Sequence, residues 1–214
     1  MTHTLHRSGD RESLKGDYIF LAMASREYNL SGAAPKLRKI AEIFAKYNPV
    51  NMGDMSSGKP LTMARGATPK EIIDNISDRS IVHAVYTDRE IVKKVLRELK
   101  EADVGISVVV SGIFDEVFDA CKEVSISGPF SVDLSIGIMG KTQLLPEEEI
   151  LDITTMCGHG LVSRHLVKHL IEKIKRGQTT VEEAAHELAK QCVCGIFNPD
   201  RAAKLLRKIL NKEK

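Results

Sequence analysis

The sequence has no hydrophobic run long enough to cross a membrane. Its longest apolar stretches are short, such as ISVVV at 106–110, whereas a membrane-spanning helix needs about 20 apolar residues. Residues 1–17 are polar and lack the apolar core of a signal peptide. The sequence also lacks a strong net charge, with 31 Lys and Arg against 29 Asp and Glu. We therefore expect a cytoplasmic protein whose partners include neither a membrane nor nucleic acid.

The sequence is also poor in cysteine, with four in 214 residues, and it has no internal repeat or low-complexity tract. Because 43% of the residues are hydrophobic, a chain of this length can bury a core without disulfide bonds. In a reducing compartment the cysteines are not expected to form structural disulfides. They are predicted to be buried core thiols, metal ligands or reactive thiols.

Apolar periodicity in the first two thirds of the chain indicates alternating strands and helices. Strands are predicted at 17–25, 80–87, 105–112 and 131–139, and helices at 31–49, 69–76, 88–102 and 113–124. Strand–helix–strand order favours parallel neighbours joined by right-handed crossovers. We therefore predict an α/β (or α+β) fold, with a small, mostly parallel sheet in a domain covering residues 1–145.

Two stretches depart from this alternation. Residues 50–68 are rich in Gly, Ser and Met and show no clear period, which indicates a long loop of the kind that is often functional. After Pro146 the pattern is helical, with a break at Gly177 and a further helix start at Asn198. We predict an all-helical C-terminal part covering residues 146–214.

The main candidate site lies in this helical part and consists of two short cysteine motifs. Cys157 and His159 lie in Cys-Gly-His-Gly, and Cys192 and Cys194 lie in Cys-Val-Cys-Gly. The motifs are 35 residues apart (192 − 157), a span that holds one helix, a turn and a returning helix. Since an antiparallel helix pair returns the chain to the end where it began, we predict that the motifs lie close together.

The donor atoms of the two motifs predict a metal site. Zinc binds Cys and His in tetrahedral sets, and three thiolates are also typical of an iron–sulfur cluster. The predicted metal ligands are Cys157, His159, Cys192 and Cys194, and the predicted cofactor is zinc or an iron–sulfur cluster. The same residues also fit a metal-free arrangement in which small buried thiols fill two helix junctions.

Thiol chemistry is a further alternative. Cys157 is predicted to lie just before a helix N-terminus, where free amides and the helix dipole lower a thiol pKa. In this interpretation Cys157 and His159 are catalytic residues, with His159 as the base or ion-pair partner. A disulfide between Cys157 and Cys192, or between Cys192 and Cys194, would give redox cycling.

The stretch MCGHG (156–160) resembles the loop that carries one catalytic cysteine in proline racemase-type enzymes. CVCGIFNPDRAAKLL (192–206) is similar to their second cysteine loop. The resemblance implies a racemase-like thiol enzyme that uses Cys157. Those enzymes are longer and place their two cysteines in two pseudo-symmetric halves, whereas here both motifs flank one helical hairpin.

Basic side chains outside the cysteine motifs predict a small anionic ligand. Arg7, ahead of the first strand, and Lys59, in the loop at 50–68, are candidates for orienting an anion. The leading interpretation is a metal- or iron–sulfur-binding protein that acts as an enzyme on a small anionic metabolite. The alternatives are a metal-free thiol enzyme that uses Cys157 and a non-catalytic accessory protein. A homo-oligomer is compatible with each of them.

Overall fold

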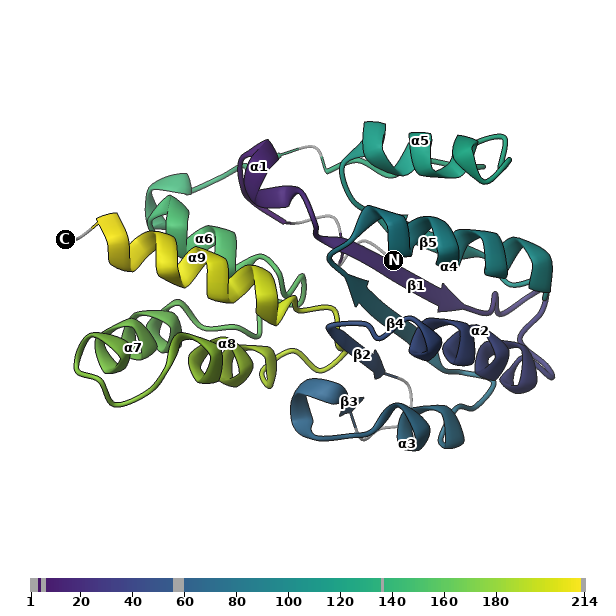
Figure 1. Cartoon of the computed structure of the whole chain (residues 1–214), viewed down its shortest axis with the longest axis horizontal. Coiled ribbons are helices and arrows are strands. Elements are labelled where there is room, and N and C mark those ends of the chain that lie inside the picture. The colour runs from purple at the N-terminus through teal and green to yellow at the C-terminus, as the bar shows by residue number, and fades with distance from the viewer. Residues whose placement is uncertain (1–3, 5–6, 56–59, 136, 213–214) are drawn as a thin grey trace.

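The computed structural model describes residue 4 and residues 7–55, 60–135 and 137–212 (Figure 1). Strands and helices are interspersed up to α5, and the rest of the described chain is helical or irregular. In chain order the elements are α1 (Arg11–Leu14), β1 (Tyr18–Met23), α2 (Ala34–Lys46), β2 (Asn51–Asp54), β3 (Leu61–Thr62), the 3₁₀ turn η1 (Met63–Arg65), α3 (Pro69–Asp74), β4 (Ile81–Tyr86), α4 (Arg89–Ala102), β5 (Val108–Ser111), α5 (Phe114–Glu123), the 3₁₀ turn η2 (Thr142–Leu144), α6 (Glu148–Thr154), α7 (Arg164–Lys175), α8 (Val181–Ala189) and α9 (Pro199–Lys212).

Within the described residues, five strands form one sheet in the order β3-β2-β4-β1-β5. Every neighbouring pair of strands is antiparallel. Ile19 of β1, for example, pairs with Val85 of β4 on one side and with Ser111 of β5 on the other. The predicted mostly parallel sheet is therefore wrong.

The error lies in how two strand–helix–strand units combine. β1 and β2 run in the same direction, because both are antiparallel to β4, and β4 and β5 run in the same direction, because both are antiparallel to β1. However, β4 lies between β1 and β2, and β1 lies between β4 and β5. Each strand therefore contacts antiparallel neighbours, although each helix connects parallel strands. This interleaving is the split β-α-β arrangement of ferredoxin-like folds.

Two local predictions in the same part of the chain are also wrong. The stretch at 50–68, predicted to be a loop, contains β2 and β3, which are too short to show a clear period. The stretch at 131–139, predicted to be a strand, is irregular in its described residues. The other predicted strands and helices of this part are present, with ends that differ by a few residues.

The sheet separates two hydrophobic clusters. On one face Phe20 packs against Phe44 and Tyr86, with ring centroids 5.5 and 5.6 Å apart, in a cluster shared with α2–α5. Ile19 faces the opposite way, because neighbouring side chains alternate along a strand, and with Val85 it joins the cluster formed by α6–α9. The hydrophobic core of the helical part therefore extends onto two strands of the sheet.

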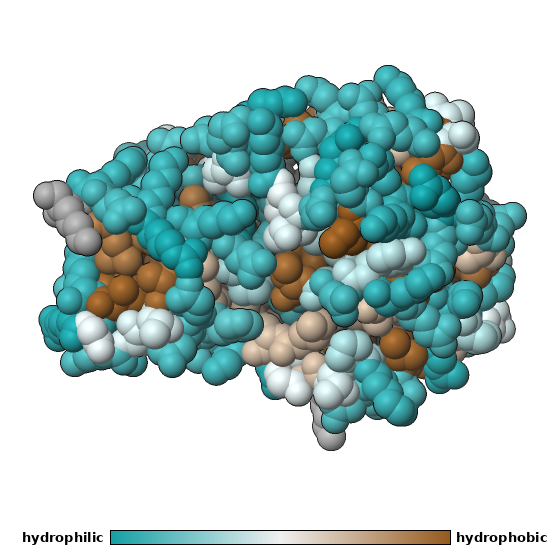
Figure 2. Space-filling view, in the orientation of Figure 1, coloured by the Kyte–Doolittle hydropathy of each residue, from teal (hydrophilic) through white to brown (hydrophobic). Residues whose placement is uncertain are grey.

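The two clusters occupy different sides of the molecule. Figure 1 places α6–α9 on one side and the sheet with α2–α5 on the other. Hydrophilic side chains cover most of the face in Figure 2, and apolar side chains gather at its left, between α7 and the C-terminal end of α9. In the described part of the chain, no helix combines the length and the apolar character that crossing a bilayer requires.

A buried carboxylate connects the N-terminal segment, the sheet and the last helix. Asp17, immediately before β1, is 2% exposed. Its carboxylate accepts hydrogen bonds from Arg7 Nε at 2.7 Å, from Asn198 Nδ2 at 2.9 Å and from Arg201 Nη1 at 3.3 Å. Arg201 also donates to the carbonyl of Ser13 at 2.9 Å. We call Asp17, Arg7, Asn198 and Arg201 the Asp17 network.

We predict that Asp17→Asn lowers the free energy of unfolding by about 3–5 kcal/mol, because it leaves two buried guanidinium groups without their shared carboxylate. Urea unfolding followed by circular dichroism measures this change. Asp115→Asn is the control, because its ion pair with Arg11 is exposed and exposed pairs contribute little. Equal and small effects of the two substitutions would contradict the role given to Asp17.

Candidate functional site

Two loops at one end of the α7–α8 helix pair carry the cysteines. α6 ends at Thr154, and the chain then turns through Cys157, whose carbonyl accepts a hydrogen bond from Gly160 N at 2.9 Å. After α8, Cys192 N donates to the carbonyl of Ala189 at 3.1 Å. The loop that follows leads to α9. The helix pair thus returns the second motif to the first.

The four side chains of the two motifs contact one another in series. The Cys157 thiol neighbours the Cys192 thiol, which is the main cause of its raised pKa. Cys192 Sγ lies 3.7 Å from Cys194 Sγ, and Cys194 Sγ lies 3.7 Å from His159 Nδ1. The structure therefore brings together all four residues that the spacing of the motifs predicted to converge.

The thiols are buried and the imidazole is not. Cys157 is 2% exposed and Cys192 and Cys194 are 0% exposed, and all are free thiols. His159 is exposed at the outer end of the series. As the side chains stand, no group of three or more His, Cys, Asp or Glu among the described residues is arranged to hold a metal ion. Metal binding therefore requires the side chains, now in series, to turn toward a common centre.

Hydrogen bonds along the series give the three thiols different pKa values. The hydrogen bond with Cys192, followed by burial, raises the pKa of Cys157. The hydrogen bond from Cys157 lowers the pKa of Cys192, but its hydrogen bond to Cys194 and its burial together outweigh this effect, so the pKa of Cys192 is raised. The hydrogen bond from Cys192 lowers the pKa of Cys194. Cys194 is therefore the thiol of the series that ionises most readily, and it lies beside His159.

The predicted lowering of the Cys157 pKa by a helix N-terminus is wrong. α7 begins at Arg164, and the side chain of its N-cap, Ser163, accepts from His165 N, so Cys157 lies well outside the first turn. Cys157 follows the C-terminal end of α6 instead, where the helix dipole is negative. The structure gives no activation of this thiol, and its catalytic role stays a prediction, as does that of His159.

The loop that follows Cys194 packs directly on β2. Gly195 has a φ of +78°, and a Cβ atom there would lie 2.8 Å from Gly53 N. Asn51 Nδ2 donates to the carbonyl of Phe197 at 2.9 Å. Backbone contacts with the sheet therefore fix the position of the second cysteine loop.

Arg7 lies inside the molecule. Its side chain is 6% exposed, and it donates to Asp17 and to the carbonyl of Ile196. Its Nη1 is buried and has no hydrogen-bond partner among the described residues. Arg7 therefore positions the loop that carries Cys194, and a role in orienting a dissolved anion stays a prediction. Lys59, the other predicted anion ligand, lies outside the described residues.

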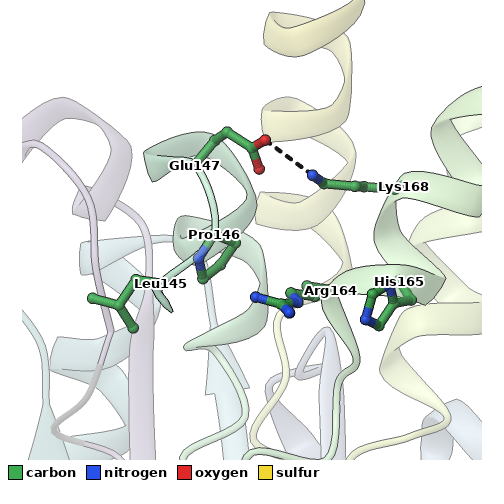
Figure 3. Close-up of a pocket in the computed structure, with 6 residues that line it drawn as sticks. All are labelled: Leu145, Pro146, Glu147, Arg164, His165 and Lys168. Carbon is green, nitrogen blue, oxygen red and sulfur yellow. Dashed lines mark hydrogen bonds and ion pairs between the residues drawn. The ribbon is translucent and has the colours of Figure 1, made fainter. Parts of the chain in front are cut away.

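A surface pocket of about 440 Å³ lies between the starts of α6 and α7 (Figure 3). Its polar lining consists of Glu147, Arg164, His165 and Lys168. Lys168 Nζ pairs with Glu147 at 2.9 Å, and Arg164 donates to the carbonyl of Leu144 at 3.0 Å. The lining is mainly basic, as a small-anion site requires, but none of the predicted site residues lines it.

Sequence reasoning missed Asp17 and Arg201, two buried charged residues of the Asp17 network. Arg201 did offer a signal, because it precedes Leu205 and Ile209 by four and eight residues and so lies on the apolar stripe of α9. A charged residue in such a stripe indicates a buried ion pair. Asp17 gives no comparable signal, because polar residues are common where a strand begins.

Comparison with models of protein families, with curated proteins and with solved structures found no match to this chain. The resemblance to proline racemase-type enzymes therefore rests on the two short motifs alone. An interpretation of the site's chemistry therefore rests on the contacts within the site.

We predict that Gly195→Ala destabilises the protein more than Gly177→Ala. Both glycines have a left-handed φ, +78° and +67°, so both substitutions introduce roughly 1–2 kcal/mol of backbone strain. Only at Gly195 would the new Cβ meet a backbone atom at 2.8 Å, whereas nothing lies within 4 Å at Gly177. Urea unfolding of both variants measures the difference. Equal losses of stability would show that the cysteine loop does not pack closely on β2.

Proposed function

We propose that the protein binds a metal ion through Cys157, Cys192, Cys194 and His159, and that zinc is the preferred ion. One observation carries the proposal: three thiols and an imidazole from two separate loops form a single contact series. Three cysteines and one histidine are an established donor set of structural zinc sites.

The separation of two of the sulfur atoms supports a single metal ion over a [4Fe–4S] cluster. Two sulfur atoms bound at about 2.3 Å to one tetrahedral zinc ion lie about 3.8 Å apart. Cys192 Sγ and Cys194 Sγ are 3.7 Å apart, which matches that separation. In a [4Fe–4S] cluster each cysteine ligand binds a different iron atom, so the ligand sulfur atoms lie farther apart. The geometry therefore favours zinc over a [4Fe–4S] cluster.

Burial supports a structural site rather than a catalytic one. Structural zinc sites are closed, whereas catalytic sites keep an open position for water or substrate. The three thiols are at most 2% exposed, so the arrangement gives a substrate no path to them. An enzymatic activity on a small anionic metabolite stays a prediction, and the metal is proposed to connect the loop after α6 with the loop before α9.

We predict about one zinc ion per chain in protein purified without oxygen, measured by elemental analysis, because a closed four-ligand site holds a single ion. Cys192→Ala is expected to lose the metal, since it removes the thiol in the middle of the series. The pKa values of Cys157 and Cys192 are raised, so zinc must displace protons from both. The zinc affinity is therefore expected to fall as the pH is lowered.

Cys121→Ala is the matched control, because Cys121 is buried in the other hydrophobic cluster and is expected to have no effect on zinc content. A brown protein that contains iron and sulfide would show that the site holds an iron–sulfur cluster and not zinc. A wild-type protein that contains no metal, and whose thermal unfolding does not change on addition of zinc, would reject metal binding.

A second candidate is redox chemistry of the thiols. The observation that favours redox chemistry is the 3.7 Å separation of Cys192 Sγ and Cys194 Sγ. Two protonated thiols in contact without a metal ion lie at the same separation. The low pKa of Cys194, caused by the hydrogen bond from Cys192, would make Cys194 the attacking thiolate, since the thiolate is the reactive form. In this case two thiols would form a disulfide as an external oxidant takes up their two electrons and two protons.

We predict that metal-free protein treated with diamide retains its free thiols if the site is built for metal alone. Redox chemistry would instead lower the thiol count of the denatured protein from four, the number of cysteines in the chain, to two. Titration with a chromogenic disulfide after denaturation measures the count. Cys192→Ala is the control, since it removes the thiol that both candidate pairs share and should abolish the loss.

A further inference from the structure

The donors of the proposed metal site differ in their access to solvent. The three thiols are at most 2% exposed. His159 is exposed, and so are the two residues that follow it, Gly160 and Leu161. An ion held by all four donors would therefore have three ligands in the interior and one at the surface of the molecule.

Backbone contacts fix the loop that carries two of the thiols. Cys192 N donates to the carbonyl of Ala189 at 3.1 Å. A Cβ atom at Gly53 of β2 would lie 2.8 Å from the carbonyl oxygen of Cys194, so this part of the loop packs closely on the sheet. Phe197, which follows in the same loop, is 0% exposed. Moving these thiols out of the site would therefore require breaking the contacts between the loop and the sheet.

The turn that carries His159 is packed less closely. It connects two buried residues, Cys157 and Val162, which are 2% and 3% exposed. Gly160 has a left-handed φ of +68°, and among the described residues nothing lies within 4 Å of a Cβ atom placed there. The turn can therefore change its conformation and carry the imidazole outward while both of its ends stay in the core.

Charge also separates the imidazole from the thiols as ligands. Cysteine binds zinc as the negative thiolate, whereas histidine binds it as the neutral imidazole. A buried thiolate that left the ion would remain in the interior as an uncompensated charge, which is strongly unfavourable. The imidazole of His159 would leave the ion for the surface, where water solvates it. Of the four ligands, His159 is therefore the one whose release costs the least free energy.

We propose that His159 is the exchangeable ligand of the metal site, and that zinc enters and leaves past it while the three thiolates stay in place. This inference rests on the proposed zinc site. In the exchange step, a donor atom of an incoming chelator binds the zinc ion as the imidazole nitrogen leaves it. The ion keeps four donors, and no electrons are transferred, because zinc has no redox chemistry.

Release of zinc from the loaded full chain to excess pyridylazoresorcinol, followed by the absorbance of the zinc complex, tests the proposal. Loss of a group that supports a metal ligand already costs about 10–100-fold in metal affinity. We therefore expect His159→Ala to retain zinc on the three thiolates but to release it at least about tenfold faster than the wild type. His159→Cys supplies a fourth thiolate and is expected to release zinc more slowly than His159→Ala.

His169→Ala is the matched control, because His169 is an exposed histidine of α7 outside the contact series, and its release rate should equal that of the wild type. Cobalt(II) in place of zinc supplies a spectroscopic readout. The thiolate-to-cobalt absorption is expected to persist in His159→Ala, and the d–d bands are expected to change, because water replaces the imidazole. A purely structural role of His159 would not change those bands.

The possible failures of this proposal and of the zinc site give different results. Wild-type protein that holds zinc and releases it at the same rate as His159→Ala would overturn the exchange at His159 and leave the zinc site standing. A folded His159→Ala that holds no zinc would also overturn it, since the three thiolates alone would then not retain the ion. Wild-type protein that takes up no zinc would reject the zinc site and this inference together.

Discussion

The position of the candidate site depends on one carboxylate that two buried guanidinium groups share. Asp17 stands at the start of β1, and Arg7 and Arg201 reach it from the N-terminal segment and from α9. Burial lowers the pKa of Arg201, and Asp17 opposes this effect. Separating buried partners leaves charges without compensation, which is strongly unfavourable. The network therefore holds the start of α9 in a fixed position relative to the sheet.

This constraint determines where the cysteines lie. Arg7 also donates to the carbonyl of Ile196, two residues after Cys194, and Gly195 packs against the backbone of β2. The second cysteine loop is thus held from the sheet side, while the helix pair α7–α8 brings it to Cys157 from the other side. A metal ion at this point would join the loops directly, and its binding free energy would contribute to folding. The sheet, the ion pairs and the thiols therefore belong to one cooperative arrangement.

The sequence predicted what depends on neighbouring residues and missed what depends on distant ones. The helix predicted at 88–102 is α4, because its apolar spacing and its Asp88 cap are local. The meeting of the cysteine motifs was also predictable, since one helix, a turn and a second helix form a local unit. The order of the strands was not, because β4 could lie beside β1 or beyond β2 with the same sequence pattern. The partner of Arg7 was hidden for the same reason, since Asp17 is buried only in the folded chain.

The contrast between β2 and residues 130–135 shows why strands are harder to predict than helices. β2 has only four residues and a weak pattern, yet it is a strand because β4 supplies the hydrogen bonds of its backbone. Residues 130–135 have a clear alternating pattern, yet none of the described strands pairs with them. A helix satisfies its own backbone groups, whereas a strand needs a partner from elsewhere. An alternating pattern therefore indicates which side chains share an apolar face, and the partner backbone decides whether that face becomes part of a sheet.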